Sequence, residues 1–274
     1  MSSPQVSVIF CHHTAENAAT VAAALPESND PTYYTALECA FDDLDPHNDA
    51  RRAVGDIQVD AQQFMAGEQA ELEDIYEGGF YSRFLHAATQ LGRTNLKILF
   101  VDAGRTTNGV RALQKVTKSF DGASTLAAWQ QAAGDPAAYI HRVASDIADS
   151  FIYRENLVAD QVASIADAIQ YGPMSLIVGA DHYGLMPLLR ARGLRTSAIA
   201  LDRPSNSCEM AVANMLRAGK QFETRILAAM GLAEWLTPDS TKSGETFLRL
   251  RGKTHTEIMH LAQRVYCGET VTLQ

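Results

Sequence analysis

Two histidines follow apolar runs of the chain and are its first candidates for chemistry. His13 comes shortly after the run of residues 6–11, and His182 comes shortly after the run of residues 176–180. A histidine at the end of a strand can be a metal ligand or a proton carrier, and a histidine that merely bonds a nearby carbonyl is the alternative. His12 and His13 would point in opposite directions on an extended segment, so at most one of them should face a site.

A glutamate and an arginine interrupt apolar patterns elsewhere. Glu38 lies in the predicted strand of residues 33–41, where a buried carboxylate needs a cation, a proton or a metal. Arg154 lies on an apolar helix stripe between Phe151 and Val158, and a guanidinium that faces a core needs carboxylate or ligand oxygens. Arg154 is therefore predicted to pair with Glu38 or to bind a substrate oxyanion, and an arginine that snorkels at the helix edge is the third interpretation.

The segment after His13 is predicted to begin a helix. Thr14 is a plausible N-cap, and a helix starting there would direct free N–H groups and its positive dipole toward the same site. Glu16 would lie in the first turn, where its charge suits the dipole. The acidic run of residues 42–49 lacks the glycine of an EF-hand loop and is predicted to be a solvated loop. The glycine motifs of dinucleotide-binding, P-loop and serine-hydrolase sites are absent from the sequence.

These residues require a scaffold that brings strand ends together. The sequence predicts an α/β fold with a mostly parallel central sheet flanked by helices and a C-terminal helical extension. The α/β core is expected over residues 1–205, and the extension, packed on that core, over residues 206–274. Sites in such sheets form at the carboxyl ends of strands, where Asp102 and Asp181 are also expected. Strands are predicted at residues 6–11, 33–41, 96–102, 176–180 and 196–201, and helices at 58–76, 81–91, in much of 111–170, at 185–192 and after 204.

The composition narrows the class of protein. The chain has 274 residues, a net charge of −9 and no run rich in lysine or arginine, which argues against nucleic acid or an anionic membrane as a partner. Its apolar stretches are too short to cross a bilayer, and the N-terminus does not resemble a signal peptide. The four cysteines have no zinc-ribbon or CxxC spacing. A cytoplasmic protein with reduced thiols is expected.

Four short motifs resemble a superfamily that joins the TraB/PrgY proteins, the TIKI proteases, the erythromycin esterases and the ChaN-like haem-binding lipoproteins. The Gly-x-x-His of that superfamily matches residues 179–182, and its Arg-acidic helix start matches residues 153–159. Its second-strand glutamate matches Glu38. Its first-strand Gly-Glu-x-His-Thr matches residues 10–14 only at the last two positions, because Phe10 and Cys11 replace the glycine and the glutamate. The similarity covers roughly residues 6 to 200.

The resemblance implies a hydrolase of peptide or ester bonds. In a metal-dependent version His13, Glu38 and His182 would hold zinc or manganese with an open position for water. Glu16 or Asp181 would then take the proton of that water, and Arg154 would stabilise charge on the carbonyl oxygen. In a metal-free version one histidine would be the base. Cys11 in place of the glutamate means that another carboxylate substitutes for it, or that hydrolysis is altered or lost.

Two further classes of function stay open. One is a non-catalytic protein that binds haem or another planar ligand, which the missing carboxylate favours. The other is an enzyme-derived signalling or interaction module. The expected partners are a small-molecule or peptide substrate and, through the C-terminal helices, a second copy of the chain.

Overall fold

The computed structural model describes nine segments of the chain. The described residues are 5–26, 33–38, 59–60, 80–93, 97–101, 148–169, 173–220, 224–237 and 242–273. They belong to two compact units, of which the first combines Met1–Thr107 with Arg154–Pro204 and the second combines Asn108–Tyr153 with Ser205–Gln274. The second unit thus resumes at Ser205, next to the boundary expected from the sequence. It also contains Ala148–Tyr153, which the sequence assigned to the core. The expected packing of the extension on the core stays a prediction.

The first unit is built on a parallel sheet. The five parallel strands that the structure describes lie in the order β4-β2-β5-β1-β6, and a two-residue strand, β3, pairs antiparallel with β4 at the edge. β5 lies between β1 and β2, so the carboxyl ends of these three strands are neighbours. This confirms the predicted α/β class. The bounds are β1 Gln5–Cys11, β2 Tyr34–Leu37, β3 Val59–Asp60, β4 Lys97–Phe100, β5 Met174–Gly179 and β6 Arg195–Ala200.

One predicted strand and one predicted helix differ from the structure. β2 ends at Leu37, so Glu38 lies just beyond the strand rather than inside it, although its N–H still bonds the carbonyl of Ile177 at 3.0 Å. The helix predicted from residue 58 is wrong at its start, because Val59 and Asp60 extend along β4. The remainder of that predicted helix lies outside the described residues.

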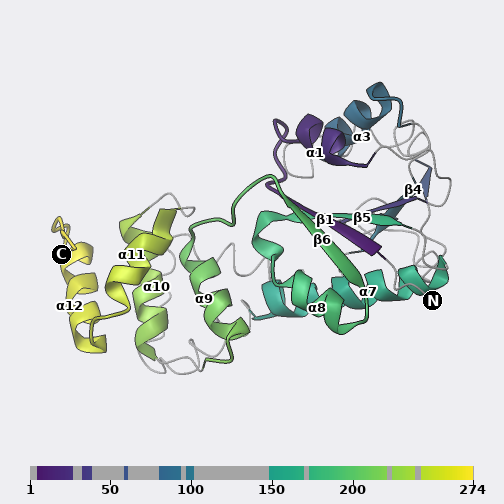
Figure 1. Cartoon of the computed structure of the whole chain (residues 1–274). Helices are drawn as coiled ribbons and strands as arrows, with labels where there is room; N and C mark the ends of the chain where they lie inside the picture. Colours follow the sequence, from purple (N-terminus) through teal and green to yellow (C-terminus); the bar gives the residue numbers. More distant parts are fainter. Residues whose placement is uncertain are drawn as a thin grey trace, which may run out of the picture. The chain divides into compact units, whose positions relative to one another are not determined.

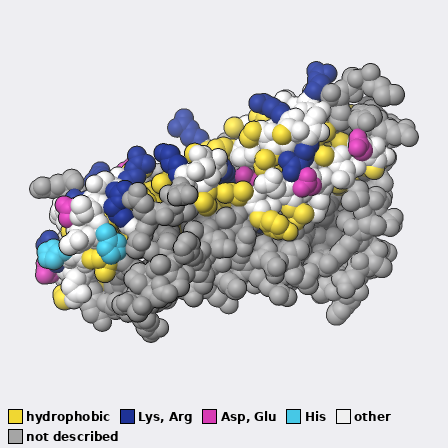
Figure 2. Space-filling model, turned by 90° about the horizontal axis from the view of Figure 1, so that it is seen from below, with side chains coloured by type: hydrophobic (Ala, Val, Ile, Leu, Met, Phe, Trp, Pro, Cys, Tyr) yellow, Lys and Arg dark blue, Asp and Glu magenta, His cyan; other side chains and the backbone are white. Residues whose placement is uncertain are grey.

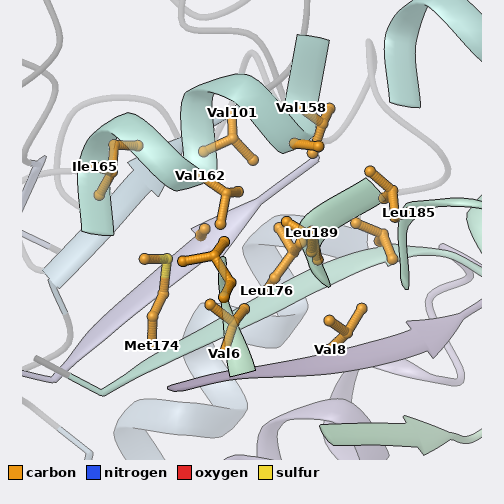
Figure 3. Close-up of a cluster of buried hydrophobic side chains, with 14 of the residues drawn as sticks. Val6, Val8, Val101, Val158, Val162, Ile165, Met174, Leu176, Leu185 and Leu189 are labelled. Atoms are coloured by element: carbon orange, nitrogen blue, oxygen red, sulfur yellow. The ribbon is translucent and has the colours of Figure 1, made fainter. Parts of the chain in front are cut away.

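Helices cover both faces of the sheet (Figure 1). α1 (Ala18–Ala24) and α3 (Phe80–Gln90) cover one face, and α7 (Arg154–Ala168) and α8 (Leu185–Ala191) cover the other. Along β1, Ile9 packs toward the first pair of helices and Val8 toward the second, as the alternation of a strand requires. Figure 3 shows the second of these cores, to which the helices contribute Val158, Val162, Ile165, Leu185 and Leu189 and the strands contribute Val6, Val8, Met174 and Leu176.

The predicted helix start at Thr14 is wrong. α1 begins at Ala18 with Asn17 at the N-cap position, and residues 14–17 form a turn closed by a bond from the Asn17 N–H to the Thr14 carbonyl. The Asn17 side chain donates to the carbonyl of His12 and to Oδ2 of Asp202, and that same oxygen accepts the main-chain N–H of His12 at 2.7 Å. This contact with the segment after β6 holds the chain in a turn and delays the helix.

The apolar stripe predicted around Arg154 is confirmed for the residues that follow Arg154 but not for Phe151, which precedes it. Val158, Val162 and Ile165 are buried against the sheet, but Phe151 lies in the core of the second unit, with the guanidinium carbon of Arg217 5.9 Å from its ring centre. Ala148–Tyr153 form a π-helical turn, η5, which has more residues per turn than the α-helix that follows. Phe151 therefore does not continue the stripe of that α-helix.

The described part of the second unit from Ser205 onward is helical, as predicted for the C-terminal region. α10 packs against its three neighbours, α9, α11 and α12, and the cluster that they bury includes Phe247 and Ile258. Ser207 caps α9 by accepting the N–H of Met210, and Thr254 forms a capping box with Glu257 at the start of α12. The bounds are α9 Cys208–Arg217, α10 Thr224–Leu236, α11 Ser243–Leu250 and α12 His255–Tyr266.

Gly244 packs closely against the backbone of Asn206. Its N–H donates to the Asn206 carbonyl at 2.9 Å, and a Cβ at this position would lie 2.7 Å from that same oxygen. We expect Gly244→Ala to lower the free energy of unfolding by about 1–3 kcal/mol, because main-chain atoms must move to make room. Urea unfolding followed by circular dichroism measures the effect.

Gly252 is the matched control for this substitution. A Cβ at Gly252 would meet nothing within 4 Å, so Gly252→Ala should change the free energy of unfolding by about 0.5 kcal/mol or less. Equal losses in the two variants would contradict the close approach at Gly244.

Membrane and nucleic-acid partners were both expected to be absent. Within the described residues, no helix has the length and apolar character that a bilayer span requires. On the face shown in Figure 2, Lys and Arg side chains are spaced among hydrophobic and uncharged ones. The expectation about nucleic acid stays a prediction.

Candidate functional site

The candidate site lies at the carboxyl ends of β2 and β5. Glu38 follows β2 directly, and His182 closes the short 3-10 helix η6 (Ala180–His182) that follows β5. Arg154 is the first residue of α7. The structure therefore brings together three of the residues predicted from the sequence.

The carboxylate of Glu38 is the centre of this group. Its Oε1 accepts a bond from Nη2 of Arg154 at 2.9 Å and lies 2.8 Å from Nε2 of His182. Its Oε2 accepts the main-chain N–H of Gly179 at 2.6 Å. The side chains of Glu38, Arg154 and His182 are 5%, 12% and 9% exposed, so these charges interact largely out of water. Of the interpretations of Arg154, pairing with Glu38 is the one observed.

His182 lies between two carboxyl groups. Its Nε2 faces Glu38, and its Nδ1 lies 3.6 Å from Oε1 of Glu155, the second residue of α7. Burial alone lowers the pKa of the imidazole. The charge of Glu38, the Glu155 carboxyl and the bond to Glu38 outweigh burial and the opposing charge of Arg154, and they raise the pKa of His182 from 6.5 to about 9. At neutral pH His182 is therefore an imidazolium.

Glu38 is held in its ionised form, which complements the charge of the His182 imidazolium. Burial raises the pKa of its carboxyl, but the charge of His182 and its hydrogen bond, then the charges of Arg154 and His13, outweigh burial. They hold the pKa of Glu38 well below its usual value of 4.5. The group is consequently an ionised carboxylate bound to two cations, in the protonation state that each partner favours.

His13 lies beside this group, against the start of α3. Its ring stacks on Phe80, with centroids 4.8 Å apart and planes at 18°. Its Nδ1 is 3.4 Å from the hydroxyl of Tyr81, which donates to the main-chain carbonyl of Glu38 at 2.7 Å. His12 instead uses its main-chain N–H to bind Asp202. That the two histidine side chains point in opposite directions stays a prediction.

Other predicted residues lie elsewhere or differ in role. Glu16 is exposed, and bonds from its own main chain and from Thr14 lower its pKa, so its carboxylate is satisfied locally and outside the group around Glu38. Asp181 is half-buried in η6. Gly179 has a φ of −55° and a ψ of 142°, which suit any residue. Its importance is spatial, because a Cβ there would lie 3.4 Å from Oε2 of Glu38.

Two residues of the site were missed by sequence reasoning. Glu155 was noted only as the acidic residue after Arg154, and an acid in a first helical turn is usually explained by the helix dipole. Tyr81 is the second residue of an amphipathic helix, where an aromatic residue usually belongs to the core. Cys11, which replaces the expected glutamate, is fully buried, with its Sγ 3.9 Å from the carbonyl of Val178. Asp102 and the acidic run of residues 42–49 lie outside the described residues.

In this metal-free arrangement two of the three predicted metal ligands, Glu38 and His182, contact each other. Among the residues that the structure describes, no group of three His, Cys, Asp or Glu side chains is suited to a metal ion. Nε2 of His182 and Oε1 of Glu38 are at hydrogen-bond distance from each other, 2.8 Å, and both ring nitrogens of His182 face carboxyl oxygens. A zinc ligand must instead present an unprotonated nitrogen at roughly 2.0–2.1 Å. Metal dependence stays a prediction.

Comparison with protein-family models, with curated proteins and with solved structures found no match for this chain. The superfamily resemblance of the four motifs therefore stays a prediction. The site has to be interpreted from its own geometry.

Proposed function

We propose that this protein is a hydrolase that cleaves an ester or peptide bond in a small-molecule or peptide substrate. The observation that supports the proposal is the buried group of Glu38, Arg154 and His182 at neighbouring strand ends, with His13 beside it. Such charges are costly to bury and are frequent at functional sites. We assign the enzyme to the cytoplasm, where the free thiols of Cys11 and Cys267 are the expected state.

The two histidines have different parts in the proposed reaction. His182 is a poor base at neutral pH, because it already carries a proton on each ring nitrogen. His13 is therefore the base that takes a proton from the attacking water. Arg154 and the His182 imidazolium stabilise the negative charge that develops on the carbonyl oxygen. Glu38 is a positioning residue that holds both cations.

The proposed steps balance without a further reactant. The water oxygen bonds to the carbonyl carbon while His13 accepts a water proton, and the carbonyl electron pair moves to oxygen. When that pair returns, the C–O or C–N bond breaks, and the leaving group takes the proton from His13. The products are a carboxylic acid and an alcohol or amine.

The base is tested with His13→Gln. Full-length protein is assayed against a panel of nitrophenyl esters and fluorogenic peptides, and the turnover number kcat of the variant should fall by about 100-fold, the lower end for loss of a general base. His86→Gln is the matched control, because His86 is exposed on α3 and bonds Gln90. Undiminished hydrolysis by His13→Gln would contradict the assignment of the base.

Elemental analysis separates the metal-free and metal-dependent versions. We expect no stoichiometric zinc or manganese in wild-type protein purified without a His tag. Stoichiometric metal that is lost in both His13→Ala and His182→Ala would replace the proton-transfer role of His13 with that of a ligand.

The other two classes give different signals. A Soret band in protein purified with haem supplied would favour the ligand-binding alternative. A concentration-dependent mass, without hydrolysis of any substrate in the panel, would favour an interaction module that associates through its C-terminal helices.

A further inference from the structure

Tyr81 connects His13 to the segment that carries Glu38. It is the second residue of α3 and is 4% exposed. Its ring centre lies 5.3 Å from that of His13 and 5.1 Å from that of Phe80. Its hydroxyl is 2.7 Å from the main-chain oxygen of Glu38 and 3.4 Å from Nδ1 of His13.

The phenol has one proton, and both the Glu38 carbonyl and Nδ1 of His13 lie within reach of its oxygen. The carbonyl oxygen of Glu38 can only accept, so the 2.7 Å contact uses the hydroxyl proton of Tyr81. The remaining interaction with His13 then requires Nδ1 to donate and the phenol oxygen to accept. In a neutral imidazole only one nitrogen carries a proton.

We infer that Tyr81 fixes neutral His13 as the tautomer with its proton on Nδ1, which leaves the lone pair on Nε2. Tyr81 is a positioning residue in this scheme. The stacked ring of Phe80 keeps the imidazole in the plane that this bond needs. That Nε2 is the atom that takes the proton from water rests on the proposed function, whereas the tautomer itself does not.

The tautomer can be read directly from nitrogen chemical shifts. Full-length protein labelled with nitrogen-15 is followed by long-range proton–nitrogen correlation from about pH 6 to about pH 9, and the His13 signals are identified by their loss in His13→Gln. Once the ring is neutral, wild type should show a protonated Nδ1 and an unprotonated Nε2. Tyr81→Phe removes the acceptor of the Nδ1 proton, so the share of the Nδ1-protonated tautomer should fall.

Tyr33→Phe is the matched control. Tyr33 is also buried and is also an aromatic neighbour of β2, but its hydroxyl bonds Ser175, at the other end of the sheet from Glu38. Removal of the Tyr33 hydroxyl should leave the His13 signals unchanged. The inference is overturned if wild-type His13 carries its neutral proton on Nε2, if it stays doubly protonated throughout the pH range, or if the share of the Nδ1-protonated tautomer is unchanged in folded Tyr81→Phe. The wild-type spectrum alone decides the matter if that variant does not fold.

Kinetics then connect the tautomer to catalysis. In a hydrolytically active protein, Tyr81→Phe should reduce kcat by about tenfold or more with little change in KM, because the ring remains but its lone pair is misplaced. If wild-type His13 carries its proton on Nδ1 but the protein hydrolyses no substrate, the proposed function is refuted and the assignment of the tautomer is still supported.

Discussion

Replacing Glu38 with alanine is expected to destabilise the first unit by about 3–5 kcal/mol, the usual cost of removing one partner from a buried ion pair. The substitution leaves the Arg154 guanidinium, which cannot lose its proton, and the His182 imidazole without the carboxylate that both contact. It also removes the acceptor for the Gly179 N–H. Hydrogen exchange in peptides that cover β2 and β5 measures the loss within this unit.

The exposed pair of Arg192 and Asp160 provides a matched control. Its Nε–Oδ1 distance is 2.6 Å, but the Asp160 side chain is 65% exposed. Asp160→Ala should therefore cost about 1 kcal/mol or less. Glu38→Gln keeps the shape without the charge and should lie between the two. A loss for Glu38→Ala no greater than that for Asp160→Ala would show that the group around Glu38 contributes little to stability.

The stability of the protein should fall as the pH rises from 6.5 to about 9, through the titration of His182. The pKa of this imidazole is higher in the folded protein than in the unfolded chain, so its contribution is complete below pH 6.5 and is lost as the pH approaches about 9. At about 1.4 kcal/mol for each pH unit, the loss amounts to roughly 3–4 kcal/mol. The pKa of Glu38 is lowered instead, so its contribution is present above pH 4.5 and is lost in acid.

Urea unfolding across this pH range tests the sign and the residue. His182→Gln should be less stable than wild type at pH 6 and should lack most of the decrease between pH 6.5 and 9. His86→Gln, which alters an exposed histidine, should keep the wild-type slope. A His182→Gln variant that retains the full decrease would assign it to other groups.

The sequence predicted a contact of the site correctly where a charged residue interrupts an apolar pattern, because a buried charge requires a partner. A carboxylate after one apolar run and an arginine on an apolar helix stripe each demanded a partner, and they are partners of each other at 2.9 Å. The placement of sites at strand ends likewise predicted the positions of Glu38 and His182, because parallel strands share one carboxyl edge.

Other features depended on contacts between distant residues. Thr14 has the chemistry of an N-cap, but Asn17 takes that position because it also binds Asp202, a partner 185 residues away. Glu155 was overlooked, because helix-dipole arguments explain an acid in the first turn without any tertiary contact. The insertion of β5 between β1 and β2 has no local signal at all, yet it decides which strand ends meet.

The strand order also determines when the site can exist during synthesis. β1 and β2 leave the ribosome early, but each needs β5 as its neighbour, and β5 ends only at Gly179. A nascent chain shorter than this has two apolar strands without their shared neighbour and lacks both His182 and the N–H that Glu38 binds. Folding of the first unit must therefore wait until about two thirds of the 274 residues have been made, and chain-holding factors would have their binding sites in that interval.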